Sequence, residues 1–200
     1  MIGGIYLAAG RSQRMGQPKL ALPWMNGLPI IAHMAELFRQ AEVDPIVIVT
    51  GADRSAIEAC LEKQPVVTVH NPAYSELGMI DSVRIGLRSL QETPCTAVLI
   101  SPGDLPAMTV ETIRSLIATF KRIRASIVAP SFDGRRGHPV LLSRPEWEAI
   151  LELDEGKTLR DFLNARPEMI HHLEVSDPGI VLDLDTPEDY ASGVEGASST

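Results

Sequence analysis

Hydrophobic positions along the chain follow two alternating patterns. Short continuous apolar runs, typical of strands buried on both faces of a sheet, are separated by segments in which apolar residues recur every three or four positions, as on one face of a helix. The strands expected first are residues 4–8, 45–50, 66–69, 97–101 and 126–129. The helices expected between them begin near Pro29, Asp53, Ile80 and Thr109. The alternation predicts an α/β fold of three layers, with helices on both faces of a mostly parallel sheet.

The last third of the chain is expected to be less regular. Further strands are predicted at residues 138–142, 169–175 and 180–184, and short helices at residues 145–151 and 157–164. Pro187 suits the first position of a final helix. Residues 193–200 are small and polar, so we expect one domain over residues 1–192 followed by a flexible tail.

Composition narrows the class of protein. The 200 residues, 44% of them hydrophobic, suffice for one domain with a full core. No apolar run approaches the roughly twenty residues of a membrane span, and the apolar start lacks the features of a signal peptide, so we expect a cytoplasmic protein. A formal charge of −8 argues against nonspecific binding to nucleic acid or an anionic membrane. Cys60 and Cys95 lack metal-ligand spacing, and we expect buried thiols.

A basic loop with two glycines follows the first expected strand. Gly10 and Gly16 allow positive φ angles and a close approach of the backbone to a ligand, so that N–H groups can point at an anion. The loop also carries three cations ahead of the first carboxylate of this acidic chain. These cations are Arg11, Arg14 and Lys19. The pattern predicts a polyphosphate site, and the alternative is a solvated basic turn.

Spacing excludes the two best-known phosphate loops. Lys19 lies three residues after Gly16 and is followed by Leu20, which does not match G-x-x-x-x-G-K-[ST]. The dinucleotide fingerprint G-x-G-x-x-G is absent from the loop as well.

Residues 7–19 resemble the opening signature L-A-A-G-x-[ST]-x-R-M-G-x-x-K of the MobA-like NTP transferases, and within them the MocA-type molybdenum cofactor cytidylyltransferases. The resemblance implies a single Rossmann-like α/β domain of the nucleotide-diphospho-sugar transferase type. It also implies that the loop wraps a nucleoside triphosphate and that Arg11 and Lys19 are catalytic. The implied nucleotide-binding residues of the loop are Leu7, Ala8, Ala9, Gly10, Arg11, Arg14, Gly16 and Lys19.

Two acidic motifs resemble the metal site of this family. Asp104 lies in Gly-Asp-Leu-Pro at the end of an expected strand and matches the family's catalytic, metal-binding G-D-x-P. Asp185 lies in a segment that resembles D-x-D-T-P-E-D, where Asp183 is the alternative ligand. Two carboxylates suffice for Mg²⁺, because water and phosphate oxygens complete its shell. Asp104 could instead stabilise a turn, and Asp185 could cap a helix. Ligands of open α/β sheets bind at the carboxyl ends of strands, so Asp104 and the basic loop are expected on one edge.

Further segments resemble substrate-contacting parts of the family. Gly78 and Ser82, with Tyr74 in place of the commoner Trp, match an element that lines the nucleotide pocket. The motif R-G-H-P implies acceptor binding by Arg136, Gly137 and His138. A phosphate that attacks is already deprotonated near pH 7, which favours positioning over base catalysis for His138. Lys157 occupies a segment only weakly similar to G-D-x-G-A-R, and either contacts the acceptor or begins a solvated helix.

The resemblance extends over residues 7–189 and implies transfer of CMP from CTP to the terminal phosphate of molybdopterin, with Mg²⁺ as cofactor. Ala8-Ala9 resembles the cytidylyl branch, because the guanylyl branch more often has Gly-Gly. Alternatives are a GTP-dependent guanylyltransferase and a sugar- or polyol-phosphate nucleotidyltransferase. Two alternatives belong to other classes of protein: a non-catalytic protein that delivers the cofactor, and a redox enzyme on the same fold. The implied partners are an NTP, a pterin phosphate and a molybdenum hydroxylase that receives the product.

Overall fold

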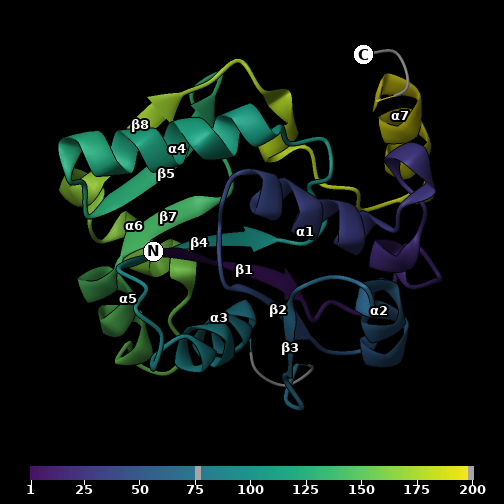
Figure 1. Cartoon of the computed structure of the whole chain (residues 1–200), viewed down its shortest axis with the longest axis horizontal. Coiled ribbons are helices and arrows are strands. Elements are labelled where there is room, and N and C mark those ends of the chain that lie inside the picture. The colour runs from purple at the N-terminus through teal and green to yellow at the C-terminus, as the bar shows by residue number, and fades with distance from the viewer. Residues whose placement is uncertain (75–77, 198–200) are drawn as a thin grey trace.

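The computed structural model describes residues 1–74 and 78–197 (Figure 1). The predicted loop of residues 70–79 and the predicted tail of residues 193–200 therefore lie partly outside the described residues, at 75–77 and 198–200. None of the described helices is long and apolar enough to cross a membrane.

A mixed, mostly parallel sheet forms the centre of the molecule. Its strands in the described part of the chain are β1 (Ile2–Ala8), β2 (Ile46–Thr50), β3 (Val67–His70), β4 (Ala97–Pro102), β5 (Ile127–Phe132), β6 (Arg135–Arg136), β7 (Val140–Ser143) and β8 (Ile170–Glu174). Their order is β3-β2-β1-β4-β7-β5-β6, and β8 pairs with β5. The strands β3, β2, β1 and β4 are parallel neighbours, and β8 is parallel to β5. β7 runs antiparallel to both β4 and β5. The predicted sheet is confirmed; the predicted strand at residues 138–142 corresponds to the antiparallel β7, and the short β6 also pairs antiparallel with β5.

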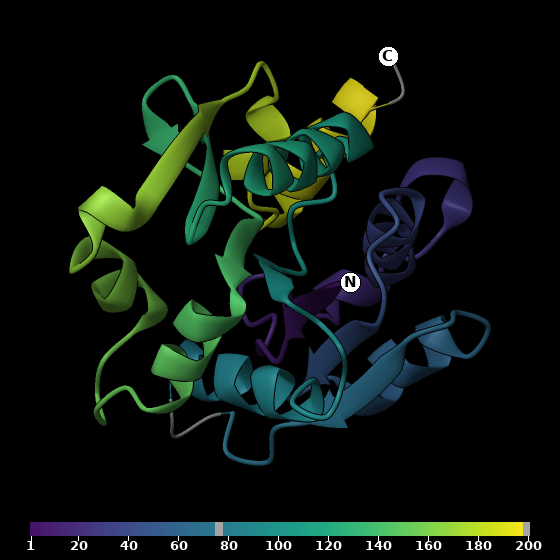
Figure 2. The same cartoon turned by 60° about the vertical axis from the view of Figure 1, so that its left-hand side comes forward.

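Helices cover both faces of this sheet (Figures 1 and 2). One face carries α1 (Ile30–Gln40), α2 (Arg54–Leu61) and α4 (Val110–Ile123), and the other carries α3 (Met79–Ser89), α5 (Arg144–Leu151) and α6 (Leu159–Asn164). Each face has its own core of buried side chains. Met34, Ile57 and Leu116 belong to the first core, and Val83, Trp147 and Phe162 belong to the second. The three predicted layers are therefore confirmed.

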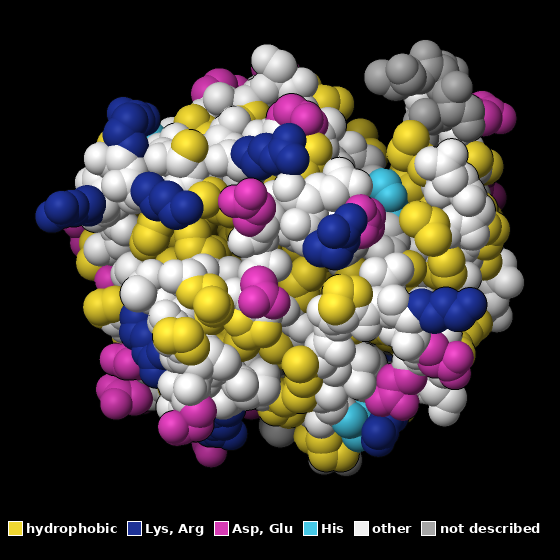
Figure 3. Space-filling view, in the orientation of Figure 1, with side chains coloured by type: hydrophobic (Ala, Val, Ile, Leu, Met, Phe, Trp, Pro, Cys, Tyr) yellow, Lys and Arg dark blue, Asp and Glu magenta, His cyan; other side chains and the backbone are white. Residues whose placement is uncertain are grey.

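Charges are mixed on the face of the molecule that shows α1 and α4. Lys and Arg side chains alternate there with Asp and Glu side chains and with apolar atoms (Figure 3). Among the described residues of this face, basic side chains do not merge into the continuous surface that binding to a polyanion such as nucleic acid requires.

Both cysteines are free thiols. Cys95 is buried, as predicted, whereas Cys60 on α2 is only half-buried. Burial still raises the pKa of the Cys60 thiol, so this side chain is a weak nucleophile.

Residues 180–184 do not form the predicted strand. The short 3₁₀ helix η4 (Pro178–Val181) occupies part of this segment, and the chain then continues without regular structure to residue 186. Contacts with loops replace strand pairing. The Asp177 carboxylate accepts hydrogen bonds from Thr109 and Thr112, and the Leu184 N–H donates to the Asp104 carbonyl at 3.0 Å. An apolar pattern does not reveal such contacts.

The final helix is longer than predicted. α7 (Pro187–Ala197) begins at Pro187 as expected, but it continues past residue 192. Gly193 lies inside the helix and packs closely, since an added Cβ atom would lie 2.9 Å from the Trp24 ring and 3.1 Å from Leu184. Residues 193–197, predicted as the start of a tail, are helical in the structure, and Gly193 packs against Trp24. The domain boundary at residue 192 stays a prediction.

The carboxyl ends of β1, β2 and β4 meet at one edge of the sheet. The three strands are adjacent and parallel, so the loops that follow Ala8, Thr50 and Pro102 lie next to one another. Gly51 follows β2 directly, and an added Cβ atom there would lie 2.4 Å from the Ala9 carbonyl oxygen. Only glycine permits this close approach of the two loops.

Candidate active site

The loop after β1 turns at Ser12 rather than at Gly10. Ser12 has a φ of 47°, in the left-handed region that non-glycine residues rarely adopt, and Gly16 has a φ of 66°. The N–H groups of Met15 and Gly16 donate to the Ser12 carbonyl at 3.1 and 3.2 Å. The expected positive φ at Gly10 is wrong. A Cβ atom at Gly10 would meet nothing within 4 Å, so its missing side chain leaves the backbone open to the adjoining cavity.

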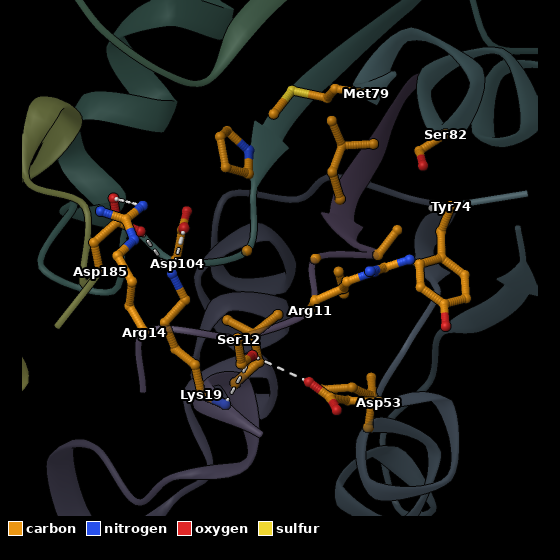
Figure 4. A pocket seen from close by; sticks show the side chains of 18 of the residues that line it. Arg11, Ser12, Arg14, Lys19, Asp53, Tyr74, Met79, Ser82, Asp104 and Asp185 are labelled. Carbon is orange, nitrogen blue, oxygen red and sulfur yellow. Dashed lines mark hydrogen bonds and ion pairs between the residues drawn. The ribbon is translucent and has the colours of Figure 1, made fainter. Parts of the chain in front are cut away.

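A cavity of about 350 Å³ lies beside this loop, at the carboxyl ends of the parallel strands (Figure 4). Every nucleotide-binding residue named from the sequence lines it except Gly16, and both proposed metal ligands line it as well. The polar and charged side chains of its wall are Arg11, Ser12, Arg14, Lys19, Asp53, Tyr74, Ser82, Asp104 and Asp185. The structure thus brings together residues from the first loop, from the end of β4 and from the segment before α7.

Lys19 joins the two acidic motifs. Its ammonium nitrogen lies 2.8 Å from Oδ2 of Asp104 and 3.1 Å from Oδ1 of Asp185, and its side chain is only 11% exposed. Arg14 contacts the other oxygen of Asp185 at 2.8 Å, but the Arg14 side chain is 69% exposed and this ion pair contributes little stability. The close approach of Lys19, Asp104 and Asp185 is the geometry that the sequence motifs imply (Figure 4).

The carboxylates around Lys19 suit a divalent cation whose coordination shell is completed by the phosphate oxygens of a nucleotide. Asp183 lies within electrostatic reach of both carboxylates. Burial raises the pKa of its carboxyl, and the negative charges of Asp104 and Asp185 raise this pKa further. No group of three or more His, Cys, Asp or Glu side chains within the described ranges is arranged to hold a metal ion. Mg²⁺ needs only one or two carboxylates when phosphate oxygens supply the rest of its shell. Asp104 and Asp185 meet this requirement, and Asp183 stays the alternative to Asp185.

The other end of the cavity offers an aromatic ring, a thioether and a hydroxyl. The Arg11 guanidinium lies 5.7 Å from the centroid of the Tyr74 ring, within the range of a cation–π contact. Met79, at the start of α3, is 60% exposed and lines the wall. The Ser82 hydroxyl accepts a hydrogen bond from Nδ2 of Asn71 at 2.9 Å, which fixes its orientation. Such surroundings suit the flat base and the ribose of a nucleotide.

Two polar residues of the wall are not identified as site residues from the sequence. Ser12 occupies the [ST] position of the loop signature, so a signal for it exists. Asp53 is expected from the sequence to cap α2, but its side chain makes no capping hydrogen bond. Its Oδ2 instead accepts a hydrogen bond from Oγ of Ser12 at 3.0 Å. No local pattern reveals this contact, because the two residues are 41 positions apart.

The residues named for acceptor binding do not line the cavity. Arg136 ends β6 and donates to Oδ1 of Asn164 on α6 at 3.1 Å. Gly137 passes so close to Ile180 that an added Cβ atom would lie 2.5 Å from the Ile180 carbonyl oxygen. Lys157 precedes α6 and is exposed, and the structure does not bring it to the cavity.

His138 is half-buried, and its imidazole is within electrostatic reach of both Asp104 and Arg136. Burial lowers the pKa of its imidazole, the negative charge of Asp104 raises it, and the positive charge of Arg136 lowers it. Arg160 of α6, which the sequence motifs do not identify, lies near Arg136: burial lowers the pKa of the Arg136 guanidinium, and the charge of Arg160 lowers it further. The His138 imidazole is therefore influenced by the negative charge of Asp104 and by the positive charge of Arg136, which itself lies near Arg160.

Fold and site together define a class of protein. A mostly parallel α/β sheet with a basic loop, a cavity of nucleotide size, one aspartate after β4 and a second aspartate before α7 has the architecture of a nucleotidyltransferase. The solved structure of Rv0371c from Mycobacterium tuberculosis H37Rv is similar, with a TM-score of 0.82 at 26% identity over 97% of each chain. A complex of Rv0371c with manganese is also similar, with a TM-score of 0.77 at 26% identity over 97% of this chain and 98% of that chain.

The chain belongs to the MobA-like NTP transferase domain family, whose model matches residues 4–172. It is 28% identical to the molybdenum cofactor cytidylyltransferase of Escherichia coli (strain K12), over 96% of this chain and 94% of that protein. It is 30% identical to the nicotine blue oxidoreductase of Paenarthrobacter nicotinovorans, over 94% of this chain and 93% of that protein. The family predicted from the loop signature is confirmed.

Proposed function

We propose that this nucleotidyltransferase transfers the CMP group of CTP to the terminal phosphate of molybdopterin and releases pyrophosphate. The observation that carries the proposal is the Lys19 ammonium, held between the carboxylates of Asp104 and Asp185 at the edge of the basic loop. The Escherichia coli relative named for this reaction matches nearly the whole chain. The pair Ala8-Ala9, typical of the cytidylyl branch, supports CTP over GTP.

The chemistry is a displacement at phosphorus. An oxygen of the acceptor phosphate attacks the α-phosphorus of CTP, and the bond from that phosphorus to the oxygen bridging it to the β-phosphate breaks. Pyrophosphate leaves with the electron pair of that bond. Catalysis of such a transfer depends mainly on positioning and on charge neutralisation. Asp104 and Asp185 would hold Mg²⁺, which when bound would supply part of this neutralisation.

The side chains of the loop supply the remainder. Lys19 and Arg11 place positive charge beside the phosphates, and Arg14 contacts the outer oxygen of Asp185. The open backbone at Gly10 allows N–H groups of the loop to approach the triphosphate. Tyr74 and Ser82 line the end of the cavity that suits the nucleoside.

The acceptor is proposed to enter past Arg136, Gly137 and His138, with Lys157 at the outer end. His138 has a lowered pKa because it is buried, so its imidazole is neutral near pH 7. The attacking phosphate needs no base, since its second pKa is about 6. His138 therefore orients the acceptor rather than removing a proton from it. A molybdenum hydroxylase is the proposed recipient of the product.

Pyrophosphate release tests the proposal. The purified protein is incubated with Mg²⁺, a source of molybdopterin and one of CTP, GTP or UTP, and we expect the fastest release with CTP. Asp104→Ala should abolish release while its melting temperature stays near that of the wild type, because Asp104 is partly exposed at a strand end. Turnover at the wild-type level in this variant would contradict the site, and a preference for GTP would replace the cytidylyl assignment by the guanylyl one.

A second candidate function is oxidoreduction, because a relative of 30% identity over most of the chain is named as an oxidoreductase. The two activities have separate readouts. Flavin absorbance in the purified protein, or consumption of NADH or NADPH with a dye acceptor, would favour the second candidate. Pyrophosphate release that depends on CTP would favour the first.

A further inference from the structure

Asp53 stands at the N-cap of α2, yet its side chain does not serve that helix. Asp at an N-cap commonly accepts a hydrogen bond from a backbone N–H of the first turn, and no such bond forms here. Oδ2 of Asp53 instead accepts a hydrogen bond from Oγ of Ser12 at 3.0 Å. Asp53 also lines the cavity (Figure 4), where a carboxylate repels a polyphosphate. The Asp53 carboxylate therefore gives α2 no capping hydrogen bond and repels a polyphosphate, and its hydrogen bond with Ser12 is the contact that can account for its position.

Ser12 connects the two ends of the basic loop after β1, the nucleotide loop (residues 10–19). Its Oγ accepts a hydrogen bond from the backbone N–H of Lys19 at 3.2 Å while donating to Asp53. Its carbonyl accepts from Met15 and Gly16, and its φ of 47° is unfavourable for serine. A residue in this conformation needs contacts that hold it, and the hydroxyl supplies two of them. The line of hydrogen bonds from Asp53 through Ser12 ends at the backbone of Lys19.

We propose that Asp53 is a positioning residue that holds the nucleotide loop through Ser12 and thereby directs Lys19. The Lys19 backbone, fixed by Ser12, places the ammonium nitrogen 2.8 Å from Asp104 and 3.1 Å from Asp185. Without the carboxylate at position 53, the Ser12 hydroxyl loses its acceptor and the left-handed turn loses a support. The effect on catalysis rests on the proposed function, whereas the effect on the loop does not.

Variants at positions 53 and 12 test this proposal in the intact protein. Asp53→Ala removes the acceptor, and Asp53→Asn keeps an acceptor oxygen but removes the charge. Ser12→Ala removes the hydroxyl, and the double variant Ser12→Ala/Asp53→Ala removes the whole contact. Glu58→Ala is the matched control, because it also removes a carboxylate from α2. Among the contacts of the described residues, the Glu58 carboxylate pairs only with Arg54.

Two measurements are made on each variant. Hydrogen exchange at the Lys19 amide reports on the loop, and pyrophosphate release reports on catalysis. In Asp53→Ala and in Ser12→Ala, we expect hydrogen exchange at the Lys19 amide to be faster by about tenfold or more. In the same variants, kcat should be lower by about tenfold or more, with a smaller change in KM. The double variant should lose no more than the worse single variant, since both substitutions break one contact. Asp53→Asn should recover most of the loss.

The outcomes separate the proposal from the proposed function. Unchanged exchange at Lys19 in Asp53→Ala overturns the proposal whether or not the protein turns over CTP. Faster exchange with unchanged kcat shows a contact that does not position Lys19, and overturns it as well. Equal losses in Asp53→Asn and Asp53→Ala also contradict it. If the wild type releases no pyrophosphate from any NTP, the proposed function fails, and exchange alone then supports or overturns the role of Asp53 in holding the loop.

Discussion

At the scale of single residues, the site depends on one ammonium group shared by two carboxylates. Lys19→Met removes that charge and keeps much of the side-chain volume. We expect pyrophosphate release to fall by about 100-fold or more, because charge on the phosphates loses a neutralising partner. Asp104 would also lose its cation and Asp185 would keep only the exposed Arg14, so Mg²⁺ alone should raise the melting temperature of Lys19→Met more than that of the wild type. Equal responses of the two proteins to Mg²⁺, or unchanged turnover, would contradict this role for Lys19.

Two half-buried histidine side chains, His33 and His138, make stability depend on pH. The Nε2 atom of His33 lies 3.1 Å from the Pro106 carbonyl; burial lowers the pKa of the imidazole, while this contact and the Glu36 charge raise it. A free histidine has a pKa of about 6.5, so just below this pH the unfolded chain binds more protons than the folded one. The free energy of unfolding therefore decreases as pH falls below about 6.5.

Urea unfolding at pH 7.5, 6.5 and 5.5 measures this dependence. His33→Gln keeps a donor for the Pro106 carbonyl but cannot take up a proton, so it should lose less stability than the wild type over this range. His138, whose pKa burial also lowers, should contribute in the same direction. An identical loss in His33→Gln and in the wild type would show that His33 does not contribute.

At the scale of elements, Asp177 fastens the segment that carries Asp185 to the start of α4. Its Oδ2 accepts from the N–H and Oγ1 of Thr109 at 2.9 and 2.7 Å and from Oγ1 of Thr112 at 2.7 Å, and its Oδ1 accepts from the Gly179 N–H at 2.9 Å. Because Asp177 is buried, Asp177→Ala leaves several donors without a partner. We expect a loss of about 3 kcal/mol in the free energy of unfolding by urea.

The same substitution should also lower activity, because the segment before α7 loses its anchor and Asp185 moves relative to Asp104. Glu92→Ala, at an exposed position after α3, is the control and should change neither quantity. If Asp177→Ala changes the free energy of unfolding as little as the control does, these hydrogen bonds do not hold the segment.

The elements that could be predicted are those whose periodicity has one interpretation. The buried run of β2 and the apolar face of α4, with Thr109 as its cap, match the expected segments within a few residues. The direction of β7 could not be predicted, since an apolar run of its length suits either orientation. Residues 180–184 are mostly apolar like a strand, but hydrogen bonds of Asp177 to the start of α4 and of Leu184 to Asp104 decide the structure of this segment. These contacts have no local signature.

At the scale of the whole molecule, ligand binding should stabilise the folded chain. The proposed site for Mg²⁺ and CTP joins residues of three separate segments, so the two ligands should stabilise the protein by about 2.7 kcal/mol at 100 times the dissociation constant. We expect a clear rise in the melting temperature of the wild type that requires both ligands. The further rise when CTP is added in the presence of Mg²⁺ should be small in Lys19→Met and in Asp104→Ala, and a further rise as large as in the wild type would contradict the site.

The site could be predicted as far as signatures near each strand end identify it. The loop residues and Asp104 lie in or next to one cavity, because parallel strands bring their carboxyl ends together. Asp185 reaches the same cavity from an irregular segment, which the hydrogen bond from the Leu184 N–H to the Asp104 carbonyl holds beside Asp104. Asp53 could not be predicted as part of the site, since its partner Ser12 is distant in the sequence. Arg160 could not be predicted either, because its proximity to Arg136 depends on how α6 packs.

The most direct test is a crystal structure of the protein with CTP and Mn²⁺, in which anomalous scattering locates the ion. We predict one strong peak within coordination distance of the Asp104 and Asp185 carboxylates, with the triphosphate against the loop of residues 10–19. A peak elsewhere, or a triphosphate bound away from Lys19, would contradict the nucleotidyltransferase site.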